Sequence, residues 1–167
     1  PWLDEGGTPF YTHLQTQAGQ DNLRDYYTIL TAVRNSHAAL RTGSFDTLLV
    51  DDAAKVYVYG RLLSDYSDAA VVIVNRAGAA QDVTVDVAGY LPAGAQFTDA
   101  LNGGVYTVDG SGLLTVPAVP ALNGAVLVAN ATLSAPPAAV TDLGVTAVSS
   151  NSVDLAWSAA AGAESYD

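Results

Sequence analysis

Acidic and imidazole side chains are the groups in this sequence whose types could support hydrolysis or metal binding. Asp4 and Glu5 form an adjacent acidic pair, and His13 and His37 are the only histidines. Two carboxyls that cleave a glycosidic bond with retention must face each other about 5–5.5 Å apart, which adjacent residues rarely achieve. We therefore interpret Asp4 and Glu5 as part of a solvated loop. Without cysteine or an HExxH spacing the histidines predict no zinc site, and His37 is interpreted as fixing a helix end.

Two further sites could bind a sugar or a cation. Trp2 could stack on a sugar ring, but a tryptophan beside a proline is more typical of a packing anchor. Asp51 and Asp52 could bind calcium, but they offer too few ligands, and a turn between two strands explains them. The sequence Asn130-Ala131-Thr132 is a glycosylation sequon that carries little weight.

Tyr57 and Tyr59 are two residues apart and would share one face of a strand, while Val56 and Val58 share the other face. If the valines point into the core, the tyrosines are exposed and could contact a polysaccharide. The opposite register buries the tyrosines, and we favour that arrangement. The sequence therefore assigns no catalytic residue and no metal ligand, and the substrate-binding residues stay unknown.

Composition limits the class of protein. Half of the 167 residues are apolar, which is enough for a β-rich core, and no cysteine is present to form a disulfide. Seventeen acidic residues against six lysines and arginines give a negative surface that repels nucleic acid and anionic lipid. No apolar run approaches the roughly 18–20 residues of a membrane-spanning helix. The start at Pro1, without methionine or a signal sequence, suggests that the natural N-terminus lies upstream.

One helix is predicted, over residues 21–40, after a loop at residues 1–20. Its apolar side chains recur every three to four residues, which is typical of one buried stripe. Asp21 is expected to be the N-cap and Gly43 to end the helix. The stripe consists of Leu23, Tyr26, Tyr27, Leu30, Val33 and Ala38.

After Gly43 the sequence changes to short β-type runs separated by glycine, asparagine, aspartate and proline. Hairpin turns are expected at Asp51-Asp52, Asn102-Gly103-Gly104 and Asp109-Gly110. The alternation of apolar and polar residues predicts an antiparallel two-sheet sandwich. The predicted strands cover residues 45–50, 55–62, 69–75, 82–87, 96–101, 105–108, 113–116 and 125–128.

A proline-containing linker is predicted at residues 131–139, followed by a second module. In this module, two strands with period-two burial flank a turn at residues 149–152. Their apolar residues are Leu143, Val145, Val148, Val153, Leu155 and Trp157.

Residues 27–43, YTILTAVRNSHAALRTG, resemble the final barrel helix of the α-amylase family, glycoside hydrolase family 13. That family places a tyrosine, a leucine, Leu-Arg, His-Pro-x-Leu and a glycine there. Tyr27, Leu30, Arg34, His37, Leu40 and Gly43 match, whereas Val33 replaces leucine and Ala38 replaces proline. The Pro1-Trp2 stretch resembles the segment after the eighth barrel strand. The segments at residues 48–61, 70–76, 89–92 and 119–127 are similar to the C-terminal sandwich of pullulanase-like and neopullulanase-like members.

Residues 141–157 and 162–167 resemble the first strands of a fibronectin type III module, in which Trp157 would be the buried core tryptophan. The implied domains are the end of a catalytic TIM barrel at 1–43, a C-terminal all-β sandwich at 44–130, a linker at 131–139 and a truncated fibronectin type III module at 140–167. The fold class is thus mainly β, with one preceding helix.

The resemblance implies a bacterial, extracellular or cell-surface enzyme that hydrolyses starch, pullulan or maltooligosaccharides with retention. Its catalytic carboxylates would lie upstream of Pro1, so this chain alone is expected to be inactive. The chain would meet α-glucan through the barrel, with no nucleic acid and no membrane insertion, and its oligomeric state stays open. No cofactor is expected in the chain, although the longer protein could hold calcium. The alternative is a non-enzymatic carbohydrate-binding or cell-surface module, in which the helix stripe would pack on the chain's own sandwich.

Overall fold

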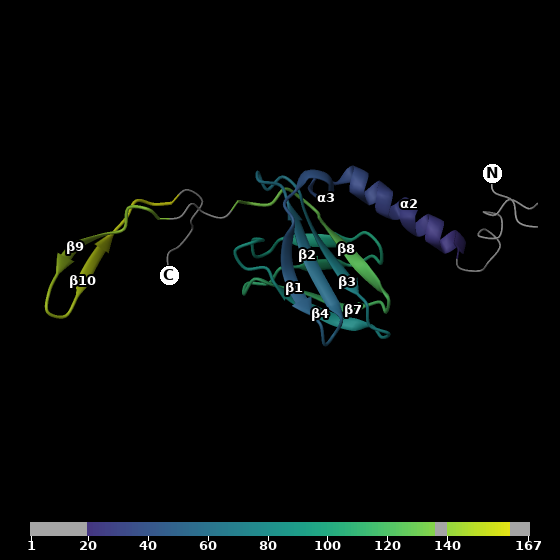
Figure 1. Ribbon diagram of the computed structural model, residues 1–167. Helices are drawn as coiled ribbons and strands as arrows, with labels where there is room; N and C mark the ends of the chain where they lie inside the picture. The colour runs from purple at the N-terminus through teal and green to yellow at the C-terminus, as the bar shows by residue number, and fades with distance from the viewer. Residues whose placement is uncertain (1–19, 136–139, 161–167) are drawn as a thin grey trace, which may run out of the picture. The chain divides into compact units, whose positions relative to one another are not determined.

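The computed structural model describes residues 20–135 and 140–160, with side-chain surroundings described from Arg24 onward (Figure 1). The chain divides into two compact units, with the boundary between Leu133 and Ser134. Leu133 is only 9% exposed and packs in the core of the first unit. The first unit therefore includes Leu133, which lies within the range 131–139 predicted as a linker.

The first unit contains an antiparallel β-sandwich of a six-stranded and a two-stranded sheet. The six-stranded sheet has the order β1-β2-β3-β8-β5-β6, and β4 pairs with β7 in the other sheet. The strands are β1 (Asp46–Asp51), β2 (Val56–Leu62), β3 (Ala69–Asn75), β4 (Gln81–Asp86), β5 (Gln96–Asp99), β6 (Val105–Thr107), β7 (Leu113–Val119) and β8 (Asn123–Ala129). This arrangement confirms the mainly β, antiparallel fold class.

The core lies between the two sheets because alternate side chains of each strand point inward. In β4, Val83 and Val85 are buried while Thr84 is exposed, so the strand has one core face and one solvent face. β3 and β8 are apolar on both faces, because a helix covers part of their outer side. The largest fully buried core side chains include Phe97, Ile73, Leu114 and Leu127.

All eight predicted sandwich strands are present within a few residues of their expected limits. The turns after Asp51 and Asn102 join paired strands, as expected. The turn at Asp109-Gly110 does not, because β6 pairs with β5 whereas β7 crosses to pair with β4. The hairpin predicted there is therefore wrong, since sequence spacing alone does not say to which sheet a strand belongs.

Two buried polar side chains hold strand ends in place. The Asn75 side-chain amide donates to the backbone oxygens of Ala79, Val119 and Pro120, each at 3.0 Å. The Asp99 carboxylate accepts from the Leu101 and Val126 N–H groups at 2.9 and 3.2 Å. Their hydrogen bonds offset the cost of burying polar atoms and fix how the strands leave the sheet.

The predicted helix is two helices, α2 (Gln20–Ser36) and α3 (Ala39–Thr42), separated at His37 and Ala38. Because α2 begins at Gln20, Asp21 lies inside the helix and the N-cap prediction is wrong. Gly43 is the C-cap of α3, so the predicted end is confirmed. Neither described helix combines the length and apolar character needed to cross a bilayer.

The second unit contains an antiparallel hairpin of β9 (Gly144–Val148) and β10 (Val153–Ala156). Its turn is closed by the Ser149 N–H, which donates to the Ser152 oxygen at 2.8 Å. The two predicted strands are confirmed, but every residue of both strands is exposed. Trp157 is 39% exposed, so the burial that the fibronectin resemblance implied for it is not observed among the described residues.

Candidate functional site

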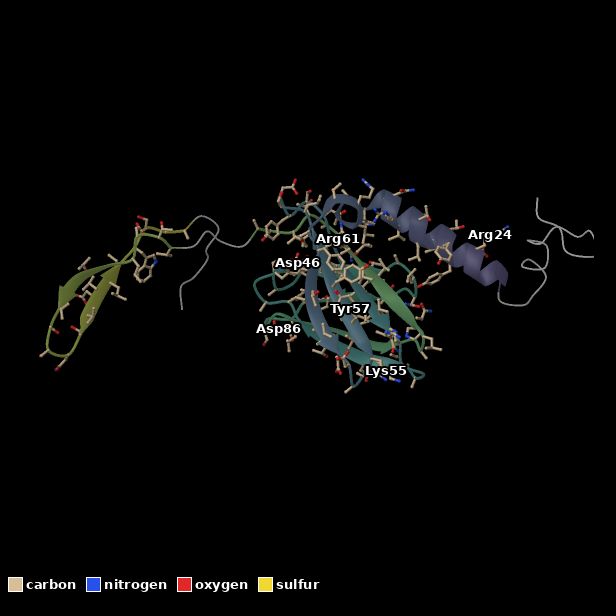
Figure 2. All side chains as sticks on the ribbon, viewed as in Figure 1. Arg24, Asp46, Lys55, Tyr57, Arg61 and Asp86 are labelled. Atoms are coloured by element: carbon tan, nitrogen blue, oxygen red, sulfur yellow. The ribbon has the colours of Figure 1, made fainter. Side chains whose placement is uncertain are left out.

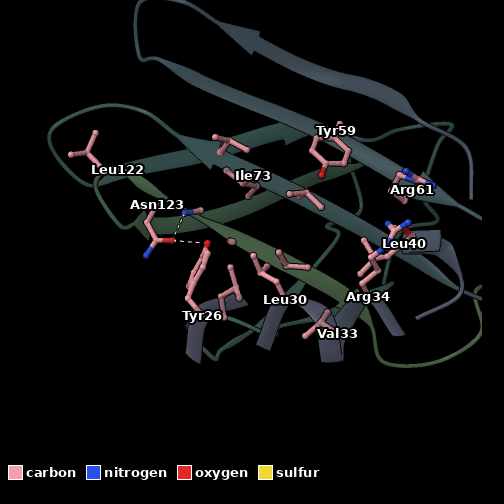
Figure 3. A pocket seen from close by; sticks show the side chains of 16 residues that line it. Tyr26, Leu30, Val33, Arg34, Leu40, Tyr59, Arg61, Ile73, Leu122 and Asn123 are labelled. Atoms are coloured by element: carbon pink, nitrogen blue, oxygen red, sulfur yellow. Dashed lines mark hydrogen bonds between the residues drawn. The ribbon is translucent and has the colours of Figure 1, made fainter. Parts of the chain in front are cut away.

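The outer face of the six-stranded sheet gathers the side chains that could recognise a ligand or a partner. One part is an aromatic row, which we define as Phe45, Tyr57 and Tyr59. The other part is a groove between α2 and the sheet, and Tyr59 belongs to both. Figure 2 labels Tyr57 and Arg61 along β2, and Figure 3 shows the groove from close by.

The register of β2 places the row outside. Val56 and Val58 are 5% and 0% exposed and belong to the core between the sheets. Because side chains alternate along a strand, Tyr57 and Tyr59 point to the opposite face, where both are half-buried. The prediction of buried tyrosines is therefore wrong. The core between the two sheets takes the β-branched valines instead of the larger rings.

The three rings of the row contact one another. The Phe45 and Tyr59 rings are stacked with centroids 4.7 Å apart, and the Tyr57 and Tyr59 centroids are 5.9 Å apart. The Tyr57 hydroxyl shares a 2.9 Å hydrogen bond with the Thr47 hydroxyl on the neighbouring strand. The Arg61 guanidinium lies 6.0 Å from the Phe45 ring centroid, within the range of a cation–π contact. Each ring of the row is thus in contact with at least one other ring.

The groove has a volume of about 480 Å³. Its floor is formed by valines of β3 and β8, and its rim carries polar groups from the helix and from β2. The Tyr26 hydroxyl donates to Asn123 Oδ1 at 3.1 Å across one end of the groove (Figure 3). The lining residues are Tyr26, Leu30, Val33, Arg34, Leu40, Tyr59, Arg61, Val72, Ile73, Val74, Leu101, Leu122, Asn123, Gly124, Ala125 and Val126.

Electrostatics distinguish this face from the rest of the chain. The groove lining contains two arginines and no carboxylate, although the chain has a formal net charge of -11. Burial raises the pKa of Tyr59 above its ordinary value, and the nearby Arg61 opposes this shift in part. Burial also raises the pKa of Tyr26, with the charge of Asp99 adding to the effect. Both phenols therefore stay protonated and can donate hydrogen bonds at neutral pH.

The apolar stripe of α2 is divided between two surroundings. Leu30 and Val33 pack against the outer valines of the sheet, so this part of the stripe is covered by the chain's own sandwich. Tyr27, another residue of the predicted stripe, is not part of this packing and is 62% exposed. The prediction of one stripe facing a single partner is therefore wrong. A 3.6-residue repeat does not say which of two neighbouring surfaces each residue faces.

Asp68 joins the two helices to the sheet. Its carboxylate contacts His37 Nδ1 at 3.2 Å and accepts the Ala39 N–H, the first of α3, at 2.9 Å. The His37 N–H donates to the Val33 oxygen at 3.1 Å, which closes the last turn of α2. The interpretation of His37 as a residue that fixes a helix end is confirmed.

The other predicted site residues lie apart from this face or outside the description. Trp2, Asp4, Glu5 and His13 lie outside the described residues. Asp51 accepts the Ala54 N–H at 2.8 Å in the β1–β2 turn, which confirms the turn interpretation. The Asn130 amide oxygen accepts the Thr98 hydroxyl at 2.6 Å. Within residues 20–135 and 140–160, histidines and carboxylates form no cluster of three that could hold a metal ion.

Phe45, Arg61 and Asp68 contribute to this face or its supports but were not singled out from the sequence. Phe45 precedes β1, so its stacking on Tyr59 depends on strand pairing that sequence spacing does not reveal. The break between α2 and α3 could have been predicted from the α-amylase family pattern, which has a proline at the position of Ala38. A proline is tolerated at the start of a helix and not in its interior.

The comparisons with known proteins match this chain to a part of longer proteins. No family model matches the chain. The chain is 33% identical over 158 residues to the amylopullulanase of Thermoanaerobacterium saccharolyticum. This alignment covers 87% of this chain and 12% of that protein. It is 34% identical over 157 residues to the amylopullulanase of Thermoanaerobacter thermohydrosulfuricus, covering 87% and 10%. The chain thus spans about a tenth of the length of the curated relatives it matches and is homologous to that part of them.

Solved α-amylase structures share the fold. The structure of AmyP in complex with maltose superposes with a TM-score of 0.60 at 19% identity, covering 80% of this chain and 24% of that one. The α-amylase of Geobacillus thermoleovorans, complexed with acarbose, gives 0.59 at 18% identity, covering 74% and 25%. The Anoxybacillus α-amylase gives 0.55 at 23% identity, covering 69% and 24%. The sandwich therefore has the fold of an amylase C-terminal domain.

Proposed function

We propose that this chain is the C-terminal part of a secreted glycosidase of the α-amylase family that hydrolyses α-glucosidic bonds in starch, pullulan or maltooligosaccharides. The observation that carries the proposal is the homology to amylopullulanases across 87% of the chain. The shared sandwich fold and the matched positions of the last barrel helix agree with it.

The chain itself is proposed to have a structural role. Retaining hydrolysis requires two opposed carboxyls, and a TIM barrel supplies them from loops after different strands. Carboxylates described here have other roles: Asp99 holds β5 to β8, Asp68 caps α3, and Asp51 closes a turn. We therefore place the catalytic carboxylates, and any calcium of the longer protein, outside this chain.

The exposed side of α2 is the surface proposed to contact that barrel. Tyr27 is 62% exposed and lies beside Arg24, Thr31 and Asn35, on a side of the helix other than the one that Leu30 and Val33 pack against the sheet. In this proposal residues 1–43 complete the barrel, residues 44–130 form the sandwich beside it, and residues 140–167 begin a fibronectin type III module. The protein would act outside a bacterial cell.

The test compares this chain with the protein translated from the reading frame extended upstream. Both are incubated with starch and pullulan, and the released reducing ends are measured. The extended protein should release reducing ends and should contain a barrel with three carboxylates in its cleft. The 167-residue chain should release none. Turnover by this chain alone, or an upstream sequence without a barrel, would overturn the proposal.

A non-enzymatic carbohydrate-binding module is the second candidate. Two observations favour it: the tyrosines of β2 lie on an outer face, and part of the α2 stripe packs on the chain's own sheet. It predicts polysaccharide binding without hydrolysis by any longer form of the protein. The reducing-end measurement on the extended protein separates the two candidates.

A further inference from the structure

We propose that the aromatic row of Phe45, Tyr57 and Tyr59 binds an α-glucan chain along the outer face of β2. The choice of an α-linked glucan rests on the proposed function, whereas the location rests on the geometry of the row. Three observations support it: the exposure and mutual contact of the rings, the polar groups beside them and the charge of the surface.

The rings form an exposed apolar surface that exists before a ligand arrives. Phe45 is 59% exposed, although it is large and apolar. Its stacking on Tyr59, and the contact of Tyr59 with Tyr57, hold all three rings in place. A sugar ring has apolar C–H faces that pack against aromatic surface. A preformed surface binds at a lower entropic cost than mobile side chains would.

Hydroxyl groups lie beside the rings, where a carbohydrate needs partners. The Tyr57 hydroxyl and the Thr47 hydroxyl share one hydrogen bond, and each keeps further capacity to donate or accept. Tyr59 lines the groove, and its hydroxyl makes no hydrogen bond within the described part of the chain. A glucan on the row would therefore find hydrogen-bond partners along both edges of the rings.

The charge of the surface favours a neutral occupant. The row has no ionisable carboxylate, and the groove beside it has none either. The Arg61 guanidinium is engaged in part: Nη2 donates to the Gly43 oxygen at 3.0 Å and the group lies over Phe45, while its buried Nε has no hydrogen-bond partner among the described residues. Cations would find no counter-charge at the groove end of the row, although Asp51 and Asp52 lie near Tyr57 at its other end, and the net charge of -11 repels large anions. A neutral polyhydroxylated chain fits both constraints.

The test is affinity electrophoresis of the full 167-residue chain in native gels containing amylopectin, towards the anode. The wild-type chain should be retarded, and Tyr57→Ala and Phe45→Ala should each weaken binding at least about fivefold. Tyr27→Ala removes a ring that is 62% exposed on the outer side of α2, so it is the matched control and should migrate like the wild type. Tyr57→Phe keeps the ring and should retain most of the retardation, while circular dichroism confirms that each variant is folded.

The proposal is overturned if the wild type is not retarded. That result would favour a protein as the ligand of the aromatic row. It is also overturned if folded row variants bind as the wild type does, or if hydroxyethylcellulose gels retard the chain equally. The result is independent of the hydrolysis test. Hydrolysis by the extended protein without retardation of this chain removes only the binding row, and retardation without hydrolysis removes only the enzyme assignment.

Discussion

At the scale of single residues, Asp68 connects the helices to the sheet. Its two oxygens contact the His37 ring and the first N–H of α3, while the residue immediately precedes β3. The Asp68 and His37 side chains are 17% and 25% exposed, so solvent screens the contact only in part. One carboxylate therefore ties the helices to the sheet on which the groove depends.

Replacing Asp68 by alanine should lower the free energy of unfolding by about 1–2 kcal/mol, because the cap of α3 and the His37 contact are lost together. Urea unfolding followed by circular dichroism measures this change. Asp52→Ala, at an exposed position of the β1–β2 turn, is the control and should change stability by less than about 0.5 kcal/mol. Equal stability of the two variants would show that Asp68 does not anchor the helices.

A second residue-scale prediction concerns Asp142 in the second unit. Its side-chain and backbone hydrogen bonds with Ser158 hold the pKa of the carboxyl below its ordinary value. A lowered folded pKa means that the contact stabilises the hairpin above the unfolded pKa and is lost as the pH falls through the folded pKa. The Ser158 amide chemical shift should therefore move towards its random-coil value below about pH 4. Asp142→Asn cannot titrate at this position, so its Ser158 amide shift should not change over this pH range. The same pH-dependent change in this variant would contradict the proposed cause.

At the scale of elements, β3 and β8 approach each other closely beneath the groove. A Cβ added at Gly124 would lie 2.2 Å from the Ile73 backbone oxygen. A backbone atom cannot rotate away as a side chain can, so only glycine fits at this position of β8. The groove floor thus depends on a residue with no side chain.

Gly124→Ala should therefore destabilise the first unit by about 2 kcal/mol or more, since the two strands must separate locally. Gly78→Ala is a matched control, because an added Cβ there meets no atom within 4 Å. Thermal unfolding of both variants checks the prediction. A midpoint for Gly124→Ala equal to that of Gly78→Ala would show that the strands are less closely packed than the structure indicates.

The same scale shows how far the sequence predicts this fold. Strand positions followed from alternation and turn residues, which are local properties, and all eight sandwich strands were found. Strand order did not follow: β8 lies between β3 and β5, and that pairing joins residues far apart in the sequence. The facing of β2 was predicted wrongly for a related reason. Valine and tyrosine are both common in strands, so propensity does not distinguish Val56 from Tyr57. Which of them is buried depends on the face of β2 that packs against the other sheet.

At the scale of the whole molecule, the candidate site was the least predictable part. Tyr57 and Tyr59 were found as a pair from their spacing, but Phe45 joins them only because β1 pairs with β2. The groove required the folded position of α2 on the sheet, which no local pattern encodes. The proposed class of protein rests on homology, whereas the proposed binding surface rests on the geometry of the aromatic row.

Truncation tests the division of the chain into two units. Because residues up to Leu133 form a compact unit with their own core, a protein ending there should unfold at the same temperature as the full chain. Differential scanning calorimetry measures this midpoint. Removing Leu133 as well should lower the midpoint, since this side chain is 9% exposed and packs in the core. If the protein that ends at Leu133 unfolds at a lower temperature than the full chain, the second unit stabilises the first.

The central proposal is that this chain is a non-catalytic part of an α-glucan hydrolase that retains anomeric configuration. Proton NMR of maltoheptaose hydrolysis tests it most directly, because the anomeric signals show the configuration of each product as it forms. The extended protein should release the α-anomer first, and this chain should leave maltoheptaose intact. Initial release of the β-anomer, or no hydrolysis by the extended protein, would contradict the account.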